Sequence, residues 1–576
     1  MTMTTWNLSR ILDRPAEAIT DADRRVKEFE RWRGKLTPTM DTADFGKIIG
    51  EYRELTEAFH RLGAYGHMMV DSDSSDAAAR ALQGKIDDFL GKAENRIRFF
   101  THWWKTLDDA QASQFHDELG DDKYIFELMR RLRQHTLPEE QENIISLKDT
   151  TGVMALNNIY DTLISRKIFT ITVDGEEKNL TGDELRAFFS DHRADVRKAA
   201  YDEFLRIIAV DRDIIGDIYR NIIVDWEHER ELRGYASAIS MRNKSNDLPD
   251  EVIASHLAAC RESAPLWHRY FALKENLLGD RITRYDIYAP WPEVHRTYSY
   301  DDALRLTLDT LKSFSPRFDE LAREIYDSNQ VDVYPRPHKT GGAYCWMVTP
   351  QLPPFLLYNF SGKITDVTTV AHETGHGVHS QLCRHLTPLS SSHPIPIAET
   401  ASIFSEMLLT ERLQRDEKDA AVKRFLLMRK LDDLFASIGR QSFFVIFEQQ
   451  AHEMLARGAT VDELSSAYLT LLHEQFGGME IPAAFKDEWL AIPHIFRTPF
   501  YCYGYSFGNL LTLGLYEQYR REGAAFIPKY ERFLSSGSTM PPVELCAQIG
   551  IDVTKKEFWL EGFKTVERMM DELEKL

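Results

Sequence analysis

A helical spacing of apolar residues runs through most of this 576-residue chain and constrains its fold more than any other feature. Apolar side chains recur at intervals of three and four with charged residues between them, which is the pattern of an amphipathic α-helix. The clearest examples cover residues 21–35, 48–62, 76–105, 184–209, 213–233 and 418–440. We therefore expect a mainly α fold.

One short stretch has the pattern of a β-hairpin instead. Residues 168–173 alternate and are rich in β-branched side chains, and Asp174-Gly175 then supplies a two-residue turn. A capping box from Thr181 to Glu184 opens the next helix. We expect a hairpin near residues 168–180.

A second stretch, residues 285–360, contains many prolines, which break long helices. These prolines are Pro290, Pro292, Pro335, Pro337, Pro350, Pro353 and Pro354. The sequence therefore predicts strands and loops here, forming a small β-sheet just ahead of the motif described below.

The charge and the cysteines narrow the possible partners and the location. A formal net charge of −20 argues against nucleic acid, because phosphate binding requires clustered Lys and Arg. Five cysteines without C-x-x-C spacing suggest a reducing compartment and no disulfide framework. The start of the chain lacks a signal-like pattern, and no apolar run approaches the length of a membrane span. We expect a cytoplasmic protein with no membrane contact and no obligate protein partner.

The most specific motif is His372-Glu373-Thr374-Gly375-His376, in a predicted helix that begins at Thr365. Helical residues i and i+4 are separated by about 40° around the axis and about 6 Å along it, so both imidazoles can bind one metal ion. Neutral imidazoles suit Zn²⁺, and Glu373 lies beside them as a general base for a bound water. The motif predicts one Zn²⁺ per chain, the alternative being an exposed helix face with two surface histidines.

Zinc also needs a third protein ligand. His379 shares the helix face but lies about 10 Å along the axis from His372, so we expect it to support the site or to pack. The next helical segment carries Glu399 and Glu406, seven residues apart on one face. One of the two carboxylates would bind the ion, and the other could orient an imidazole by accepting its second N–H.

Taken together, these residues resemble the thimet oligopeptidase and oligoendopeptidase F group of zinc metallopeptidases, and more closely the oligoendopeptidase F branch. Further landmarks of that branch occur in the same order: Leu232-Arg233-Gly234-Tyr235, Tyr285-Asp286-Ile287-Tyr288-Ala289-Pro290, Tyr298-Ser299-Tyr300 and Lys339-Thr340-Gly341-Gly342-Ala343-Tyr344. The resemblance covers residues 200–576 and extends more loosely over the N-terminal part.

The resemblance implies a two-lobed helical body around a deep substrate channel, with the small β-sheet next to the zinc-binding helix. It implies an N-terminal helical lobe of residues 1–200 and a catalytic zinc metallopeptidase domain of residues 201–576. It assigns the third zinc ligand to Glu399, in the segment Ile-Ala-Glu-Thr-Ala-Ser, and leaves Glu406 as a supporting carboxylate.

The family also places a histidine and tyrosines from late in the chain against the substrate carbonyl. The matching segment runs from His494 to Tyr505, so the resemblance implies catalytic roles for His494 and two of Tyr501, Tyr503 and Tyr505. A Tyr O–H or an imidazolium N–H can donate to a developing oxyanion. The alternative for these tyrosines is packing in a helix face.

The stretch Gly341, Gly342, Ala343 and Tyr344 has two interpretations. Glycines permit close approach of another backbone, so an edge strand here could pair with an extended peptide substrate, as the resemblance implies. A simple turn between strands is the alternative.

The activity that the resemblance implies is endopeptidase cleavage of internal bonds in short, unfolded oligopeptides. Two other classes remain open from the residues alone. A structural zinc protein would close its site with four protein ligands and would have no use for Glu373 as a base. A hydrolase acting on a non-peptide bond would share the same metal chemistry.

Overall fold

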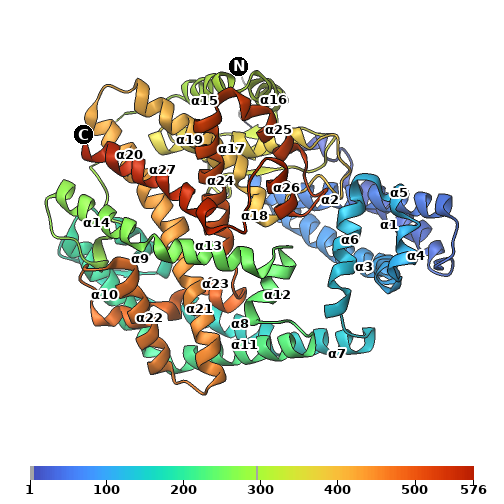
Figure 1. The fold of residues 1–576 in the computed structure, drawn as a ribbon, viewed down its shortest axis with the longest axis horizontal. Coiled ribbons are helices and arrows are strands. Elements are labelled where there is room, and N and C mark those ends of the chain that lie inside the picture. The colour runs from blue at the N-terminus through green and yellow to red at the C-terminus, as the bar shows by residue number, and fades with distance from the viewer. Residues whose placement is uncertain (1–4, 293–295) are drawn as a thin grey trace. The chain divides into compact units, whose positions relative to one another are not determined.

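The computed structural model describes residues 5–292 and 296–576, and helices make up 72% of it. The prediction of a mainly α fold is confirmed. Figure 1 labels the helices along the chain, which residue contacts divide into two compact units. Unit 1 comprises Met1–Arg133, Arg296–Arg415 and Gln518–Ile551, and unit 2 comprises Gln134–His295, Asp416–Glu517 and Asp552–Leu576.

Unit 1 contains the sheet and helix segments around the metal-binding motif. Its helices are α1 (Pro15–Phe29), α2 (Thr42–Ser72), α3 (Ala77–Thr106), α4 (Asp109–Ser113), α5 (His116–Leu119), α6 (Lys123–Arg131), α15 (Tyr300–Phe314), α16 (Pro316–Asp327), α17 (Ile364–Leu382), α18 (Ile395–Ala398), α19 (Thr400–Asp416), α25 (Ile527–Ser535) and α26 (Pro542–Gln548). Helices α1 to α3 pack against one another around buried aromatic side chains, including Phe29, Phe45 and Phe100. This aromatic packing gives the N-terminal helices a core of their own.

Unit 2 is built from the remaining helices and one hairpin. Its helices are α7 (Glu139–Asp149), α8 (Val153–Ser165), α9 (Gly182–Ala187), α10 (Ala194–Val210), α11 (Arg212–Leu232), α12 (Ala238–Ser245), α13 (Asp250–Glu262), α14 (Ala264–Leu278), α20 (Ala420–Leu434), α21 (Gln441–Ala456), α22 (Val461–Phe476), α23 (Pro493–Arg497), α24 (Tyr503–Glu522), which starts in this unit, and α27 (Lys556–Glu574). Residue 200, the boundary expected from the sequence, lies inside α10. The division at that residue stays a prediction.

The hairpin has the form that the sequence predicts. Strands β1 (Phe169–Val173) and β2 (Glu176–Leu180) pair antiparallel with Val173 opposite Glu176. Asp174 and Gly175 both have positive φ, at 56° and 80°, as a type I′ turn requires. The capping box between Thr181 and Glu184 then opens α9. The helical pattern over 184–209 is interrupted after α9, because the backbone is extended at Asp191.

The proline-rich stretch 285–360 differs from the expectation of strands and loops. Helices α15 and α16 occupy residues 300–327. Pro316 does not break them, because it stands in the first turn of α16, where the missing N–H costs nothing. The strands follow: β3 (Val331–Asp332), β4 (Tyr344–Trp346) and β5 (Phe355–Leu357), in the order β3-β5-β4.

The metal-binding motif lies on α17, which packs against this sheet and against α16. The helix begins at Ile364, one residue before the predicted start. Buried hydroxyl groups that bond to one another hold the middle of this helix. The Tyr326 hydroxyl of α16 lies 2.5 Å from the Thr374 hydroxyl and 3.0 Å from the Tyr358 hydroxyl. The small β-sheet therefore lies next to the candidate zinc helix, as predicted.

Helices α17 and α19 approach closely at Gly375. A Cβ atom at this position would lie 2.5 Å from the Ala401 carbonyl oxygen and 2.7 Å from the Ser402 Cα. Both neighbours are backbone atoms of α19, so a side chain here would have to push the two helices apart. The glycine between the two histidines is therefore required by packing.

We predict that Gly375→Ala destabilises the protein by about 1–3 kcal/mol, because the added methyl group clashes with the α19 backbone. Gly91→Ala is a matched control, since Gly91 lies within α3 and a Cβ there would meet no atom within 4 Å. Thermal unfolding of both variants measures the difference. Equal melting temperatures for Gly375→Ala and wild type would contradict the packing argument.

Candidate active site

Two helices of unit 1 bring together three metal-binding side chains. His372 and His376 extend from α17, and Glu399 lies at the junction of α18 and α19. One ligand atom from each lies within 4.8 Å of the others, and Glu399 Oε2 is 3.4 Å from both His372 Nε2 and His376 Nε2. The structure therefore brings together all three predicted zinc ligands.

These distances fit a small tetrahedral cation. Bonds of about 2.0–2.1 Å from Zn²⁺ to imidazole nitrogen and carboxylate oxygen place neighbouring ligand atoms roughly 3.3–3.4 Å apart. The two measured nitrogen-to-oxygen distances of 3.4 Å already have this length. Two imidazoles and one carboxylate are also the donor set of catalytic zinc sites that leave one position open. The residues present fit the predicted metal.

The side chain of Glu399 is held by a residue of α19. The Ser402 hydroxyl donates to Glu399 Oε2 at 2.8 Å, which orients the carboxylate toward α17. The Tyr530 hydroxyl of α25 donates to the Thr400 carbonyl oxygen at 2.9 Å and holds the start of α19. The hydrogen bond from Tyr530 therefore helps to fix the orientation of the Glu399 carboxylate.

The electrostatics of this group favour a positive charge between the side chains. Burial opposes charge on His372, but hydrogen bonds with Glu399 and Glu406 outweigh it and raise the pKa of His372 to about 10. Burial also opposes the charged form of Glu399, yet the two imidazoles hold the pKa of this carboxyl below its usual range. A carboxylate that attracts a proton onto imidazole in this way will equally attract a cation.

Glu406 and Glu373 occupy different positions around the two histidines. Glu406 Oε2 lies 3.5 Å from His372 Nδ1, the ring nitrogen that faces away from Glu399. This matches the predicted supporting position, because a carboxylate there fixes the orientation of a ligating imidazole. Glu373 is 6% exposed, and burial raises its pKa although the adjacent imidazoles lower it.

His379 does not join the three candidate ligands. It is buried two turns after His372, and its ring stacks on that of His393 at a centroid distance of 3.4 Å. The sequence gives no indication that His393 is its neighbour. Residue spacing carries no signal for this contact, because His393 belongs to the segment between α17 and α18.

The predicted substrate strand lies at the end of the sheet. Tyr344 opens β4, which pairs antiparallel with β5 and is a terminal strand in the order β3-β5-β4. Gly341, Gly342 and Ala343 precede the strand, and the Asn359 side chain donates to the Gly342 carbonyl at 2.8 Å. The Tyr344 hydroxyl donates to Asp71 at 2.8 Å, so this side chain is tied to α2.

The predicted late-chain residues lie in unit 2, where His494 on α23 is flanked by two of the three tyrosines. The Tyr501 ring is parallel to the imidazole, with centroids 6.2 Å apart, and the Tyr505 hydroxyl lies 3.5 Å from His494 Nε2. Tyr505 is 39% exposed. Tyr503 is fully buried, and its hydroxyl accepts a hydrogen bond of 2.7 Å from Asn246. The structure therefore groups His494 with Tyr501 and Tyr505, whereas the Tyr503 hydroxyl is buried against Asn246.

Glu448, which the sequence did not single out, holds this segment through a hydrogen bond with Phe500. Phe500 has a positive φ of 60°, a strained value for a side chain of this size. Its N–H donates at 2.7 Å to the carboxyl group of Glu448 on α21, which is 1% exposed. Burial raises the pKa of Glu448 to about 8. Glu448 comes from 52 residues earlier, so nothing in the local sequence points to it.

Comparison with known proteins shows the family to which this chain belongs. The family described as "Peptidase family M3" matches residues 187–565, and the one described as "Oligopeptidase F" matches residues 103–169. A helical chain with this motif and this family match is a metallopeptidase. The chain belongs to peptidase family M3, and the resemblance stated from the sequence is confirmed.

Individual relatives extend over nearly the whole chain. The oligopeptidase PepF of Bacillus subtilis is 26% identical over 99% of this chain and 87% of its own length. The chromosomal oligoendopeptidase F of Lactococcus lactis subsp. cremoris is 25% identical over 99% of this chain and 97% of its own length. The crystal structure of oligoendopeptidase-F from Enterococcus faecium matches with a TM-score of 0.73 and 22% identity, covering 97% of this chain and 98% of the other. At that identity the structural match shows the fold.

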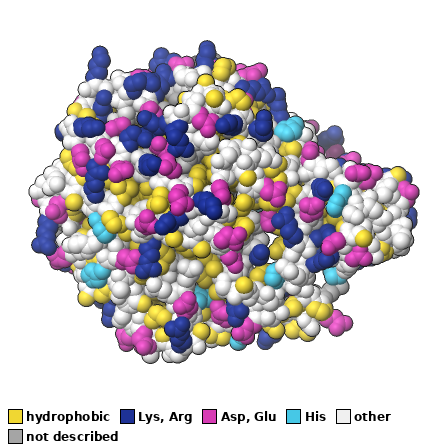
Figure 2. Space-filling view, viewed as in Figure 1, with side chains coloured by type: hydrophobic (Ala, Val, Ile, Leu, Met, Phe, Trp, Pro, Cys, Tyr) yellow, Lys and Arg dark blue, Asp and Glu magenta, His cyan; other side chains and the backbone are white. Residues whose placement is uncertain are grey.

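Two further observations bear on the surroundings of the protein. None of the helices in residues 5–292 and 296–576 combines the length and apolar character that a membrane-spanning helix needs. On the face drawn in Figure 2, acidic and basic side chains are interspersed. The expectations of cytoplasmic location and of no nucleic-acid or protein partner stay predictions.

Proposed function

We propose that this chain is a zinc-dependent endopeptidase that hydrolyses internal bonds of short, unfolded oligopeptides. The observation that carries the proposal is the convergence of His372, His376 and Glu399, each imidazole 3.4 Å from the carboxylate, beside the buried Glu373. Membership of peptidase family M3 supports the choice of a peptide bond over other hydrolysable bonds. The names of the relatives support oligopeptides as the substrate class.

We assign the proton transfers to Glu373. Zn²⁺ held by the three ligands would act as a Lewis acid, polarising the substrate carbonyl and making water acidic enough to attack at neutral pH. Glu373 would take the proton of the attacking water and then deliver it to the leaving amine nitrogen. Its burial and raised pKa support this role, since a carboxyl group that gives and takes a proton works best when its pKa approaches the operating pH.

We assign His494, Tyr501 and Tyr505 to stabilising the negative charge that develops on the carbonyl oxygen. Their mutual contacts and the exposure of Tyr505 support this choice, because a donor must be able to reach the substrate. Tyr503 has no such freedom, since its hydroxyl is buried against Asn246. Two of the three tyrosines would act, as the family pattern implies.

We further propose that the backbone of Gly341, Gly342, Ala343 and Tyr344 binds the substrate as an added strand. The terminal position of β4 in its sheet supports this, because a terminal strand can pair with an extended peptide. A deep channel would admit an extended chain and exclude a folded domain.

A cytoplasmic location is supported by five cysteines that form no disulfide in the structure.

The first prediction separates metal binding from catalysis. Glu373→Gln should keep the metal content of wild type and lose hydrolysis by about 10²–10⁴-fold, since it removes the base without removing a ligand. His372→Ala should bind one metal ion fewer per chain than wild type. Metal analysis and cleavage of a mixed peptide library measure both effects. Near-normal turnover in Glu373→Gln would refute the proposed mechanism.

The second prediction distinguishes the tyrosines. Tyr505→Phe and Tyr501→Phe should lower kcat by up to about 10²–10³-fold with little change in KM, because each removes a donor to the transition state. Tyr503→Phe is the matched control, which should retain kcat and lose about 0.5–1.5 kcal/mol of stability with its buried hydrogen bond. Steady-state kinetics and thermal unfolding report the two effects. The reverse pattern would return Tyr501 and Tyr505 to a packing role.

The third prediction concerns the size of the substrate. A peptide that is cut efficiently when free should resist cleavage when it forms a rigid surface loop of a stable host protein. The cause would be steric access, because a folded domain is far wider than one extended strand. Mass spectrometry of digests of the free peptide, the folded host and the unfolded host provides the comparison. Efficient cutting of the loop in a folded host would favour an open groove and overturn the oligopeptide assignment.

A further inference from the structure

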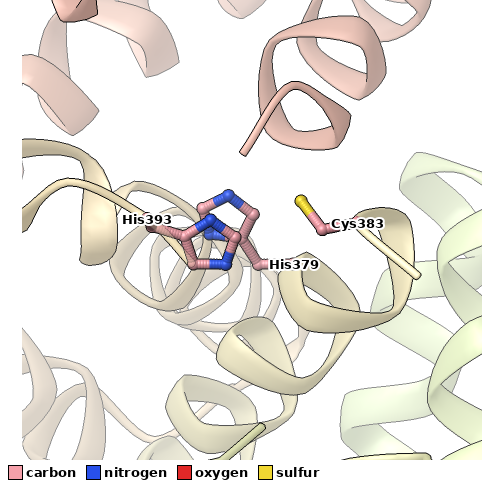
Figure 3. A group of neighbouring side chains, drawn as sticks. All are labelled: His379, Cys383 and His393. Atoms are coloured by element: carbon pink, nitrogen blue, oxygen red, sulfur yellow. The ribbon is translucent and has the colours of Figure 1, made fainter. Parts of the chain in front are cut away.

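A second group of metal-binding side chains lies further along the candidate zinc helix. His379 is within α17, Cys383 directly follows its last residue, and His393 comes from the segment that leads to α18. One ligand atom from each lies within 4.8 Å of the other two. Figure 3 shows the two imidazole rings overlapping, with the Cys383 sulfur beside them. These side chains take no part in the proposed mechanism.

The positions of His379 and Cys383 on the helix repeat those of the first pair. His379 follows His372 by seven residues, and Cys383 follows His376 by the same number. Seven residues make nearly two turns, so the second pair faces almost the same side of the helix about 10 Å further along. The i, i+4 spacing that allows two side chains to bind one ion therefore occurs twice on this helix.

Three of the four imidazole nitrogens of this group are buried without a hydrogen bond. Among the described residues, His379 Nδ1 and both ring nitrogens of His393 have no hydrogen-bond partner. His379 is 1% exposed, and the two rings stack at 3.4 Å with an angle of 12° between their planes. Buried polar atoms are normally paired, so three such atoms in one place call for a missing partner. Burial lowers the pKa of His379 and that of His393, which leaves nitrogen lone pairs available to a metal ion.

We propose that His379, Cys383 and His393 bind a second Zn²⁺ ion, separate from the one held by His372, His376 and Glu399. One thiolate and two imidazoles suit Zn²⁺, whereas Mg²⁺ and Ca²⁺ require oxygen ligands. Tetrahedral bonds of about 2.1 Å to nitrogen and 2.3 Å to sulfur need ligand atoms roughly 3.4–3.6 Å apart. The ligand atoms lie within 4.8 Å of one another, so the group would have to contract by about 1.4 Å at most.

Binding requires the loss of one proton. The Cys383 thiol donates to the Leu534 carbonyl oxygen at 3.1 Å, and burial raises the pKa of the thiol to about 12. The cation would displace this proton to solvent and form the metal–sulfur bond with the resulting thiolate. The fourth position would be taken by water or by the Leu534 carbonyl oxygen.

The role that follows is structural. A cation here would tie the segment containing His393 to the end of α17, and Glu399 lies only six residues further along that segment. The second ion would therefore help to fix the carboxylate of the first site. The existence of the second site does not depend on the proposed peptidase activity.

Cobalt provides the test, because Co²⁺ replaces Zn²⁺ and a bond between thiolate and Co²⁺ gives a near-ultraviolet charge-transfer band that imidazole and carboxylate ligands do not give. The full-length protein, stripped of metal, should bind two Co²⁺ per chain and show this band, and added Zn²⁺ should abolish it. Cys383→Ser should bind one Co²⁺ and lose the band. His372→Ala should also bind one and keep the band.

Two further variants keep the result interpretable. Cys546→Ala removes another buried thiol of unit 1 and should leave the band unchanged. His393→Gln changes a half-buried residue outside the helices, so it should leave the fold intact and remove the second Co²⁺. The proposal is wrong if wild type binds one Co²⁺ without the band, or if the band survives in Cys383→Ser. In either case the three side chains would be a metal-free packed cluster.

Discussion

The close approach of α17 and α19 at Gly375 is the contact on which the candidate site depends. Because this residue has no side chain, the α19 backbone can come near enough for Glu399 to lie 3.4 Å from both imidazoles. The Tyr326 hydroxyl, itself paired with that of Tyr358, forms a further hydrogen bond with Thr374 of α17. The geometry of a metal site made from two separate helices is only as precise as the packing between them. The residues that position the ligands therefore matter as much as the ligands themselves.

The sequence predicts what depends on local spacing. The helical periodicity, the Asp174-Gly175 turn and the His372–His376 pair each follow from residues that are close in the chain, and the structure contains all three. The resemblance, and not the spacing, favoured Glu399 over Glu406. The helices within 300–327 were missed because the prolines on either side were taken as breakers for the whole stretch, although none of those prolines lies within α15 or α16.

Contacts between distant segments could not be predicted, and they decide the details of the site. Glu448 accepts the N–H of Phe500 at a backbone angle that few side chains tolerate. This hydrogen bond holds the backbone directly before Tyr501, which lies two residues before α24 begins at Tyr503. A single sequence contains no record of a pairing between residues 448 and 500, since the Glu448 carboxyl group could accept from many different N–H groups.

The charge balance around His372 explains why a cation belongs to this part of the fold. Glu373, Glu399 and Glu406 surround the two histidines, and three carboxylates so close together repel one another when all are ionised. A proton on His372 offsets one negative charge, whereas a divalent cation offsets two and binds both imidazoles in their neutral form. The repulsion among the carboxylates therefore favours a divalent cation over a proton at their centre.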